Sequence, residues 1–137
     1  MVDIRTVSQV MNSNVSTLDA SGTVRDVIQI MTNVGVGCVI VTDRAKPIGI
    51  VTERDVMRAV MGGREVLSKS VTDVMVQPLT SVSPETPVVQ ALQLMRSKNI
   101  RRLPVVSDER LQGIITVHRD LLYWALTALG GSVADDQ

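Results

Sequence analysis

The sequence predicts a mixed α/β fold of the α+β kind, in which two βαββα motifs make a single compact module. A shift of 64 positions superimposes many apolar and glycine residues, among them Val10 on Val74, Val41 on Val105 and Gly49 on Gly113. A fixed period means that each repeat is one supersecondary unit whose apolar face is covered by its copy. A chain of 137 residues is long enough for one core but too short for two independent domains of about 100 residues. We therefore expect the two halves to share a core.

Two helices are expected in the first copy before its strands. Thr6 and Gln9 have the spacing of a capping box, in which side chains satisfy the free amides at the start of a helix. An extended stretch is expected at 15–18. Thr23 then caps a second helix, whose apolar residues recur at helical spacing: Val24, Val27, Ile28 and Met31.

A hairpin and a third helix complete the first copy. After Gly35, the run 39–42 is dominated by β-branched residues and indicates a buried strand. A turn is expected at 43–47 and a return strand at 48–51. Thr52 opens a helix that two consecutive glycines stop.

The second copy repeats this order. It predicts a helix at 71–76, an extended stretch at 79–82, a helix capped by Thr86 with Pro87 at its first position, and strands at 103–106 and 111–115 around a turn at 107–110. The domain boundaries follow from this alignment. We place the first motif at 7–63, the second at 70–129, and a flexible tail at 130–137.

Composition excludes several classes of function. The formal net charge is zero, so no long-range field attracts nucleic acid or an anionic membrane. The single cysteine, Cys38, rules out an intramolecular disulfide and favours a cytoplasmic location. No run of about 18 apolar residues is present, so we expect no membrane span. One histidine, His118, and one cysteine in an apolar run cannot assemble a zinc cluster or a His-activated nucleophile. We therefore expect no enzyme activity, no metal site and no catalytic cofactor.

Taken together, these features resemble the CBS domain, a small ligand-binding motif that works as a tandem pair (a Bateman-type module). The resemblance covers about 7–129. Its marks are the Val-Met pairs at 10/11 and 74/75, the run Asn99–Val106, and the run Gly49–Asp55. Each mark is weak alone, but they occur in order and most of them occur twice. The resemblance implies two motifs packed about a pseudo-twofold axis, with two clefts for adenosine-containing ligands.

The resemblance also implies roles for individual residues. In the family, the threonine that follows the glycine contacts phosphate and the aspartate three residues later contacts ribose hydroxyls, which here are Thr52 and Asp55, with Arg54 between them. A carboxylate can accept two hydroxyl hydrogens from a vicinal diol, and the free amides of a helix start attract phosphate. The same pair is also an ordinary helix cap, which stabilises a helix start by about 1 kcal/mol without any ligand.

The second copy departs from this pattern. After Thr116 the acid, Asp120, comes four residues later instead of three, and one added residue turns a helical side chain by about 100°. Either the helix begins one residue later and Asp120 still reaches a ribose, or this site has lost its diol contact. His118 either lines the second cleft or simply starts the last helix.

Two arginines are expected to bind phosphate. Arg101 and Arg102 precede the second buried strand, where basic residues of the family reach nucleotide phosphates, and a guanidinium offers a planar fork of donors for that purpose. The first copy has Gly37 and Cys38 at these positions, which predicts two unequal sites. The adenine side of the clefts is assigned, by the same resemblance, to Asn14, Val15, Val36, Pro78, Leu79, Ile100 and Pro104.

The predicted partners are an adenosyl small molecule, a second copy of the chain and an unidentified effector protein. The homodimer is expected through motif helices including 119–129, because that helix is apolar on nearly every side. Nucleic acid is disfavoured, since the only aromatics, Tyr123 and Trp124, are adjacent and form no stacking platform. The leading hypothesis is a non-catalytic sensor of AMP, ADP, ATP or a related compound, with the need for magnesium left open. The alternative is a ligand-free interaction module that acts through homodimerisation.

Overall fold

A computed structural model describes residues 5–118, 122, 126, 129 and 130. The chain divides into two compact units that do not coincide with the two sequence repeats. We call Asn14–Leu79 the inner unit, and Met1–Ser13 together with Thr80–Gln137 the outer unit. Each unit is described by itself.

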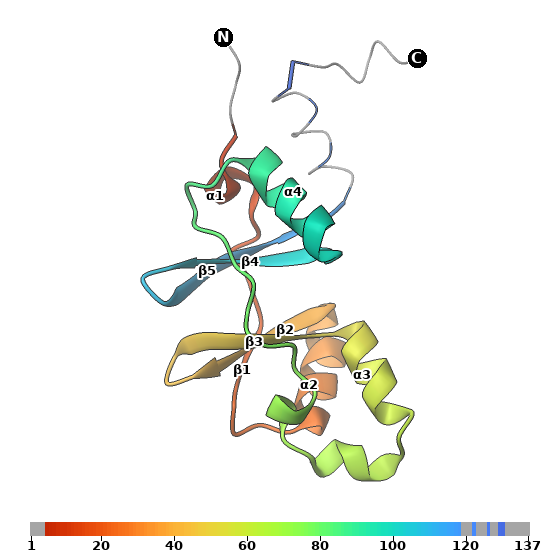
Figure 1. Ribbon diagram of the computed structural model, residues 1–137. Coiled ribbons are helices and arrows are strands. Elements are labelled where there is room, and N and C mark those ends of the chain that lie inside the picture. Colours follow the sequence, from red (N-terminus) through yellow and green to blue (C-terminus); the bar gives the residue numbers. More distant parts are fainter. Residues whose placement is uncertain (1–4, 119–121, 123–125, 127–128, 131–137) are drawn as a thin grey trace. The chain divides into compact units, whose positions relative to one another are not determined.

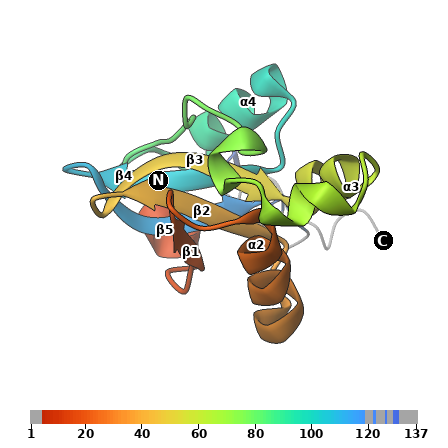
Figure 2. The ribbon, with the colours of Figure 1, turned by 90° about the horizontal axis from the view of Figure 1, so that it is seen from below.

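The inner unit contains one three-stranded sheet with order β1-β2-β3. Strand β1 pairs in parallel with β2, and β2 pairs in antiparallel fashion with β3. The elements in chain order are β1 (Thr17–Asp19), α2 (Val24–Ile30), a π-helical turn η1 (Met31–Gly35), β2 (Cys38–Asp43), β3 (Lys46–Thr52), α3 (Glu53–Val60) and two 3₁₀ segments, η2 (Arg64–Ser68) and η3 (Val71–Asp73). Helices α2 and α3 lie on the same face of this sheet (Figures 1 and 2).

The outer unit repeats this plan with fewer residues in regular strands. Its elements are α1 (Val7–Val10), α4 (Val88–Lys98), β4 (Arg102–Ser107) and β5 (Arg110–Thr116). Val82 makes a parallel bridge with Val105, at the place where Leu18 of β1 pairs with Val41 in the inner unit. Helix α4 ends at Asn99, whose left-handed conformation (φ 54°) is the usual way to stop a helix.

Each core contains side chains from both sequence repeats. In the inner unit, Val71 of the second repeat packs with residues of the first: Val27, Val39, Val41, Val51 and Val56. In the outer unit, Val7 of the first repeat packs with residues of the second: Val88, Ala91, Met95, Leu103, Val105 and Ile115. The structure therefore has two cores, one in each unit, instead of the one shared core that was expected, and the repeats exchange their leading segments between these cores.

Matching hydrogen bonds fix the two exchanged segments. The Val7 and Val71 amides donate to the carbonyls of Thr86 and Gly22, at 2.8 and 2.9 Å. Further along, Asn12 and Ile114 exchange two backbone hydrogen bonds, as do Val76 and Ile50. All these pairs are related by the period of 64 positions, so the exchange is reciprocal.

Two local predictions are corrected by the structure. Helix α4 begins at Val88, and Pro87 is the N-cap residue with ψ 141° rather than the first helical residue. The reason is tertiary, because the Val88 amide donates to the Arg5 carbonyl of the exchanged segment. The expected helix 71–76 is only the 3₁₀ turn η3, since Val76 is held in a bridge with Ile50.

The hairpin turns lie where they were expected. Ser107 pairs with Arg110 around the second turn, and Asp43 pairs with Lys46 around the first, which ends one residue before the predicted 47. Each turn has two central residues, both with positive φ: Arg44 and Ala45 in one, Asp108 and Glu109 in the other. This is the type I′ geometry, which matches the twist of the flanking strands.

Candidate functional site

The edge of the inner sheet where β3 ends collects most of the first motif's predicted site residues. Thr52, the last residue of β3, pairs with Cys38, the first residue of β2. Strand β1 runs parallel to β2, so it begins at the same edge. The segment just before β1 is held there because the Ile40 amide donates to the Ser16 carbonyl at 3.0 Å. Asn14, Val15 and Val36, which precede β1 and β2, therefore lie at the edge at which α3 starts.

Thr52 and Asp55 form a capping box at this edge. The Asp55 carboxylate oxygen Oδ2 accepts from the Thr52 amide at 2.8 Å and from the Thr52 hydroxyl at 2.9 Å. The Asp55 amide in turn donates to Thr52 Oγ1 at 3.4 Å. Both side chains are half-buried, whereas Arg54 between them is exposed. The cap interpretation and the ribose interpretation concern the same carboxylate, and its second oxygen, Oδ1, has no hydrogen bond to the residues described here.

The first turn of α3 has few free amides. The Glu53 amide donates to the Gly37 carbonyl at 3.1 Å, and the Asp55 amide is taken by the Thr52 hydroxyl. Sequence reasoning expected these amides to attract phosphate and missed the Gly37 carbonyl. The signal that could have revealed it is the hairpin register, because Gly37 directly precedes the residue that pairs with Thr52.

Pro78 and Leu79 are not brought to this edge. Val76 pairs in antiparallel fashion with Ile50, so the chain after Val76 runs away from the Thr52 end of β3. Pro78 is exposed and Leu79 is half-buried.

The outer unit places the second set at the corresponding edge. Arg102, the first residue of β4, pairs with Thr116, the last residue of β5. Arg101 is exposed, and its guanidinium Nη2 donates to the Val117 carbonyl at 3.4 Å. The Val117 amide donates to the Arg101 carbonyl at 2.9 Å, which repeats the contact between Glu53 and Gly37. Two guanidinium groups therefore stand where the inner unit has a glycine and a cysteine.

The remaining predicted residues of this set lie in different environments. Ile100 is half-buried against the outer core, and Pro104 is buried in β4. His118 is exposed, and its carbonyl accepts from the Leu122 amide at 3.1 Å, as in a helical turn. Asp120 lies outside the described residues. The contact of its carboxylate with a ribose therefore stays a prediction.

One carboxylate with a lowered pKa, that of Asp19, lies away from both edges. Asp19, at the end of β1 opposite to Thr17, has a pKa below its usual value because the Ser21 hydroxyl and amide both donate to its carboxylate. Among the residues that the structure describes, no cluster of three metal-ligating side chains occurs, and no helix is long and apolar enough to cross a membrane.

Comparison with known proteins decides the family. The model of the CBS domain matches this chain twice, at residues 7–62 and 71–119. The chain belongs to the CBS domain family. This tandem CBS protein is 35% identical over 125 residues to CBSX3, a mitochondrial CBS domain-containing protein of Arabidopsis thaliana, covering 82% of this chain and 61% of that one. The chain thus spans about three fifths of the length of this curated relative.

Solved structures agree with this assignment. A protein with CBS domains from Burkholderia ambifaria MC40-6 has a TM-score of 0.79 and 28% identity, with 97% of each chain covered. A hexameric CBS-CP12 protein from bloom-forming cyanobacteria has a TM-score of 0.75 and 34% identity, covering 82% of this chain and 67% of that one. The CBS domain pair of MJ0100, solved with 5′-methylthioadenosine and S-adenosyl-L-methionine, has a TM-score of 0.75 over 83% and 90% of the two chains. At 22% identity, the last shows likeness of fold alone.

Proposed function

We propose that this tandem CBS protein is a non-catalytic sensor that binds an adenosine-containing ligand at its CBS motifs and passes the bound state to a partner. Tandem CBS modules are regulatory, and the fold accommodates adenosyl ligands in the MJ0100 domain pair. The observation that carries the proposal is the edge of the inner sheet, where a half-buried threonine and aspartate start α3 beside the segments that precede β1 and β2. A cytoplasmic location is part of the same proposal.

A ribose diol fits the chemistry of this edge. Asp55 uses Oδ2 for the helix cap, and a carboxylate oxygen has lone pairs for further donors. The 2′ and 3′ hydroxyls of a ribose would donate to Oδ1, and the apolar side chains Val15 and Val36 would flank the base. Ligand binding would then shift the protein toward whichever conformation holds the ligand more tightly.

The test is a thermal-shift and calorimetry screen with AMP, ADP, ATP, NAD and S-adenosylmethionine. A ligand at about 100 times its dissociation constant should stabilise the folded protein by about 2.7 kcal/mol. Asp55→Ala should abolish that stabilisation. No response to any of these compounds would contradict the proposal.

The chain offers a matched control for the Asp55 variant. Asp26 makes the same capping box at the start of α2, where its Oδ2 accepts from the Thr23 amide at 2.9 Å and its amide donates to Thr23 Oγ1 at 3.3 Å. Asp26→Ala should therefore cost about as much stability as Asp55→Ala, about 1 kcal/mol. It should leave ligand binding unchanged. Strand β1 begins at the Thr52 edge of the sheet, and α2 follows the other end of β1.

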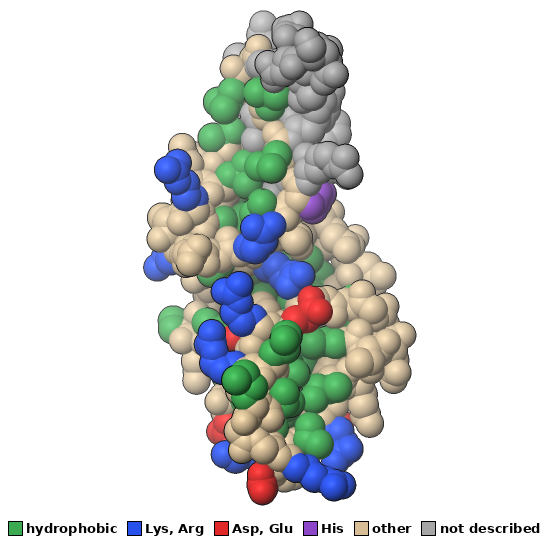
Figure 3. Space-filling view, turned by 90° about the vertical axis from the view of Figure 1, so that its right-hand side faces the viewer, with side chains coloured by type: hydrophobic (Ala, Val, Ile, Leu, Met, Phe, Trp, Pro, Cys, Tyr) green, Lys and Arg blue, Asp and Glu red, His purple; other side chains and the backbone are tan. Residues whose placement is uncertain are grey.

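One observation favours the alternative function, an interaction module that acts by self-association. Helix α3 and the residue after it carry an apolar stripe, defined as Met57, Val60 and Met61, whose exposed fractions are 66%, 41% and 86%. Figure 3 looks onto the side of the molecule that carries α3, and apolar side chains gather there. Self-association through α3 is compatible with the sensor. The two functions differ in the effect of Asp55→Ala, which should abolish ligand binding in a sensor and change only the stability of a ligand-free interaction module.

The expected role of helix 119–129 in that assembly is a prediction that stays untested. Most of its residues lie outside the described part of the chain. Leu122 and Leu129, which are described, are 54% and 72% exposed.

A further inference from the structure

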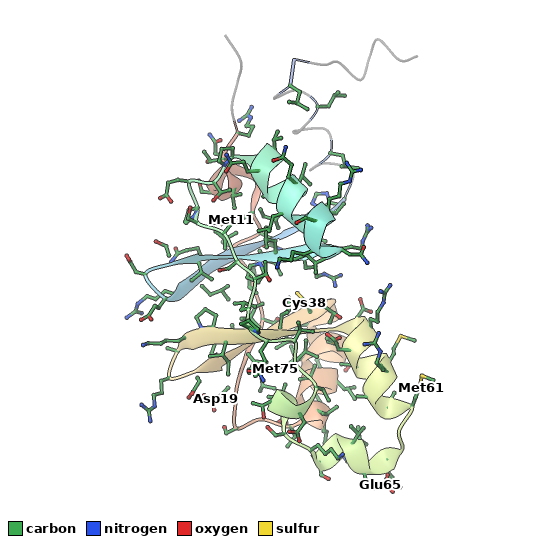
Figure 4. All side chains as sticks on the ribbon, in the orientation of Figure 1. Met11, Asp19, Cys38, Met61, Glu65 and Met75 are labelled. Atoms are coloured by element: carbon green, nitrogen blue, oxygen red, sulfur yellow. The ribbon has the colours of Figure 1, made fainter. Side chains whose placement is uncertain are left out.

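Methionine side chains are distributed unequally between core and surface. Met57 and Met61 are 66% and 86% exposed. The other methionines that the structure describes pack inside or against the two cores: Met11, Met31, Met75 and Met95. In Figure 4 the labelled Met61 lies on the outer side of α3, away from the sheet of the inner unit. A dissolved oxidant therefore reaches the thioethers of Met57 and Met61 more readily than those of the other described methionines.

The two exposed thioethers lie on one face of α3. They are four residues apart, a spacing that makes side chains neighbours on a helix, and Met61 continues the helical backbone with φ −64° and ψ −19°. Helix α3 packs on the inner core through Val56, which is 9% exposed. The core therefore leaves the stripe of Met57, Val60 and Met61 uncovered.

The charges around the stripe suit a second copy of the same chain. Glu53 lies one helical turn before Met57, and Arg54 and Arg58 lie beside the stripe, all three of them exposed. In a symmetric pair, each contact occurs twice with the roles of the two copies exchanged. Two α3 helices that pack side by side in parallel can place each Glu53 against Arg54 of the other copy. This face is therefore complementary to itself, and its mixed charge disfavours a strongly acidic or strongly basic partner.

Oxidation changes the character of this face. When hydrogen peroxide reacts with the sulfur lone pair, an S–O bond forms, the O–O bond of the peroxide breaks, and water leaves. The thioether is oxidised by two electrons and the peroxide is reduced by two. The product, methionine sulfoxide, is polar, and sulfoxide reductases return it to the thioether. Burying two sulfoxides between copies is unfavourable, because their oxygen atoms lose hydrogen bonds to water there.

Building on the self-association described above, we propose that Met57 and Met61 form a site of reversible oxidation that controls the pairing of two copies through α3. In the reduced state the stripe is buried between the copies. Peroxide oxidises the two thioethers in the separated chain, which then stays separate until its sulfoxides are reduced. The assembly of the protein thus responds to oxidants, whichever ligand the CBS motifs bind.

The experiment treats the full chain with hydrogen peroxide and measures its mass in solution by light scattering after size exclusion. The untreated chain should be a dimer. Peptide mass mapping should find sulfoxide, an added mass of about 16 Da per sulfur, at Met57 and Met61 before the other described methionines. Oxidation should raise the dissociation constant of the dimer by at least about tenfold, since each copy loses the burial of two apolar side chains. Treatment with methionine sulfoxide reductases should restore the dimer.

Matched variants separate oxidation of the stripe from other effects of peroxide. The double variant Met57→Leu with Met61→Leu keeps the stripe apolar but has no sulfur there to oxidise. It should dimerise like the parent chain and stay dimeric in peroxide. Met31→Leu is the control, a volume-conserving change of a methionine that packs against the inner core. It should leave both the dimer and its response to peroxide unchanged.

The possible outcomes distinguish the switch from the association on which it depends. A chain that is monomeric before peroxide is added would overturn the self-association together with the switch. A dimer that persists with sulfoxides at both positions would overturn the switch alone. The same holds if neither methionine is oxidised, or if the leucine variant dissociates as readily in peroxide as the parent chain.

Discussion

At the scale of single residues, the tightest constraint in each unit is a glycine in the second strand of its hairpin. A Cβ atom on Gly49 would lie 2.6 Å from Met75 Sδ and 3.0 Å from the Val76 carbonyl oxygen. On Gly113 it would lie 2.7 Å from Met11 Sδ and 2.9 Å from the Asn12 carbonyl oxygen. Figure 4 labels the two methionines. A methionine side chain can move, but the backbone oxygen belongs to the exchanged segment and cannot.

We therefore expect Gly49→Ala and Gly113→Ala each to lower the free energy of unfolding by about 1–3 kcal/mol, the usual cost of overpacking. Urea denaturation measures this. Gly62→Ala is the control, because the nearest atom to its Cβ would be the Ala59 carbonyl oxygen at 3.3 Å. If the Gly49 and Gly62 variants had equal free energies of unfolding, the backbone of the exchanged segment would have moved to make room for the added methyl group.

Asp19 gives a prediction about pH at the same scale. Its carboxylate accepts from the Ser21 hydroxyl at 2.6 Å and from the Ser21 amide at 2.9 Å, which lowers its pKa below the ordinary 3.8. A lowered pKa contributes stability above the unfolded value, and this contribution is lost as pH falls through the folded value. Ser21→Ala should raise the pKa of Asp19, as NMR titration of its carboxyl carbon would show. An unchanged pKa would mean that the amide alone is sufficient.

At the scale of elements, each exchanged segment covers the core of the other repeat. Val7 and Val71 are fully buried, and each lies among residues of the repeat to which it does not belong. Their segments contain only a four-residue helix and a three-residue 3₁₀ turn. Such short helices have little stability of their own, so packing on the other repeat must hold them in place.

Val7→Ala should destabilise the outer unit by about 1–3 kcal/mol through lost burial and the cavity left behind. Hydrogen exchange should then speed up in α4, β4 and β5 of the second repeat and not in β2 and β3 of the first. Val71→Ala is the matched variant and should give the opposite map. If each variant instead weakened its own repeat, the exchange of leading segments would be wrong.

Sequence reasoning succeeded at elements whose signal is local. The capping boxes at Thr6, Thr23 and Thr52 were predictable because donor and acceptor lie three residues apart. It failed where the deciding partner is distant: Pro87 sits outside α4 because Val88 is bound by Arg5. The hairpin turns were predicted at the right places, but the positive φ of their central residues was not, since these include neither glycine nor asparagine. At the candidate site, the residue types were predictable from the repeat, but the satisfied amides of α3 depend on strand register.

At the scale of the whole molecule, the exposed stripe of Met57, Val60 and Met61 is the described surface that most resembles an interface between copies. Exposed apolar patches on a small protein mark sites of association, and most soluble oligomers are symmetric assemblies of one chain. The hexameric CBS-CP12 relative shows that a chain 34% identical to this one assembles beyond a dimer.

We expect the chain to form a homodimer whose interface contains the stripe. Its mass should be twice the 14.9 kDa of one chain. Replacing Met57 and Met61 together by lysine should convert it to monomers, because burying two charges at an interface is costly. Light scattering after size exclusion measures the mass. Glu65→Lys, just beyond the stripe in η2, is the charge control. A mass unaffected by the double change would move the interface to other helices, including 119–129.

The reciprocal placement of Val7 and Val71 also orders events during synthesis. When the first repeat has left the ribosome, its opening residues have no surface to settle on, and its own sheet still lacks a cover. That cover arrives with residues 69–76, so the inner unit can be finished while translation continues. Residues 5–12 must wait until β4 and β5 have emerged, and they are therefore among the last parts of the two motifs to reach their final position.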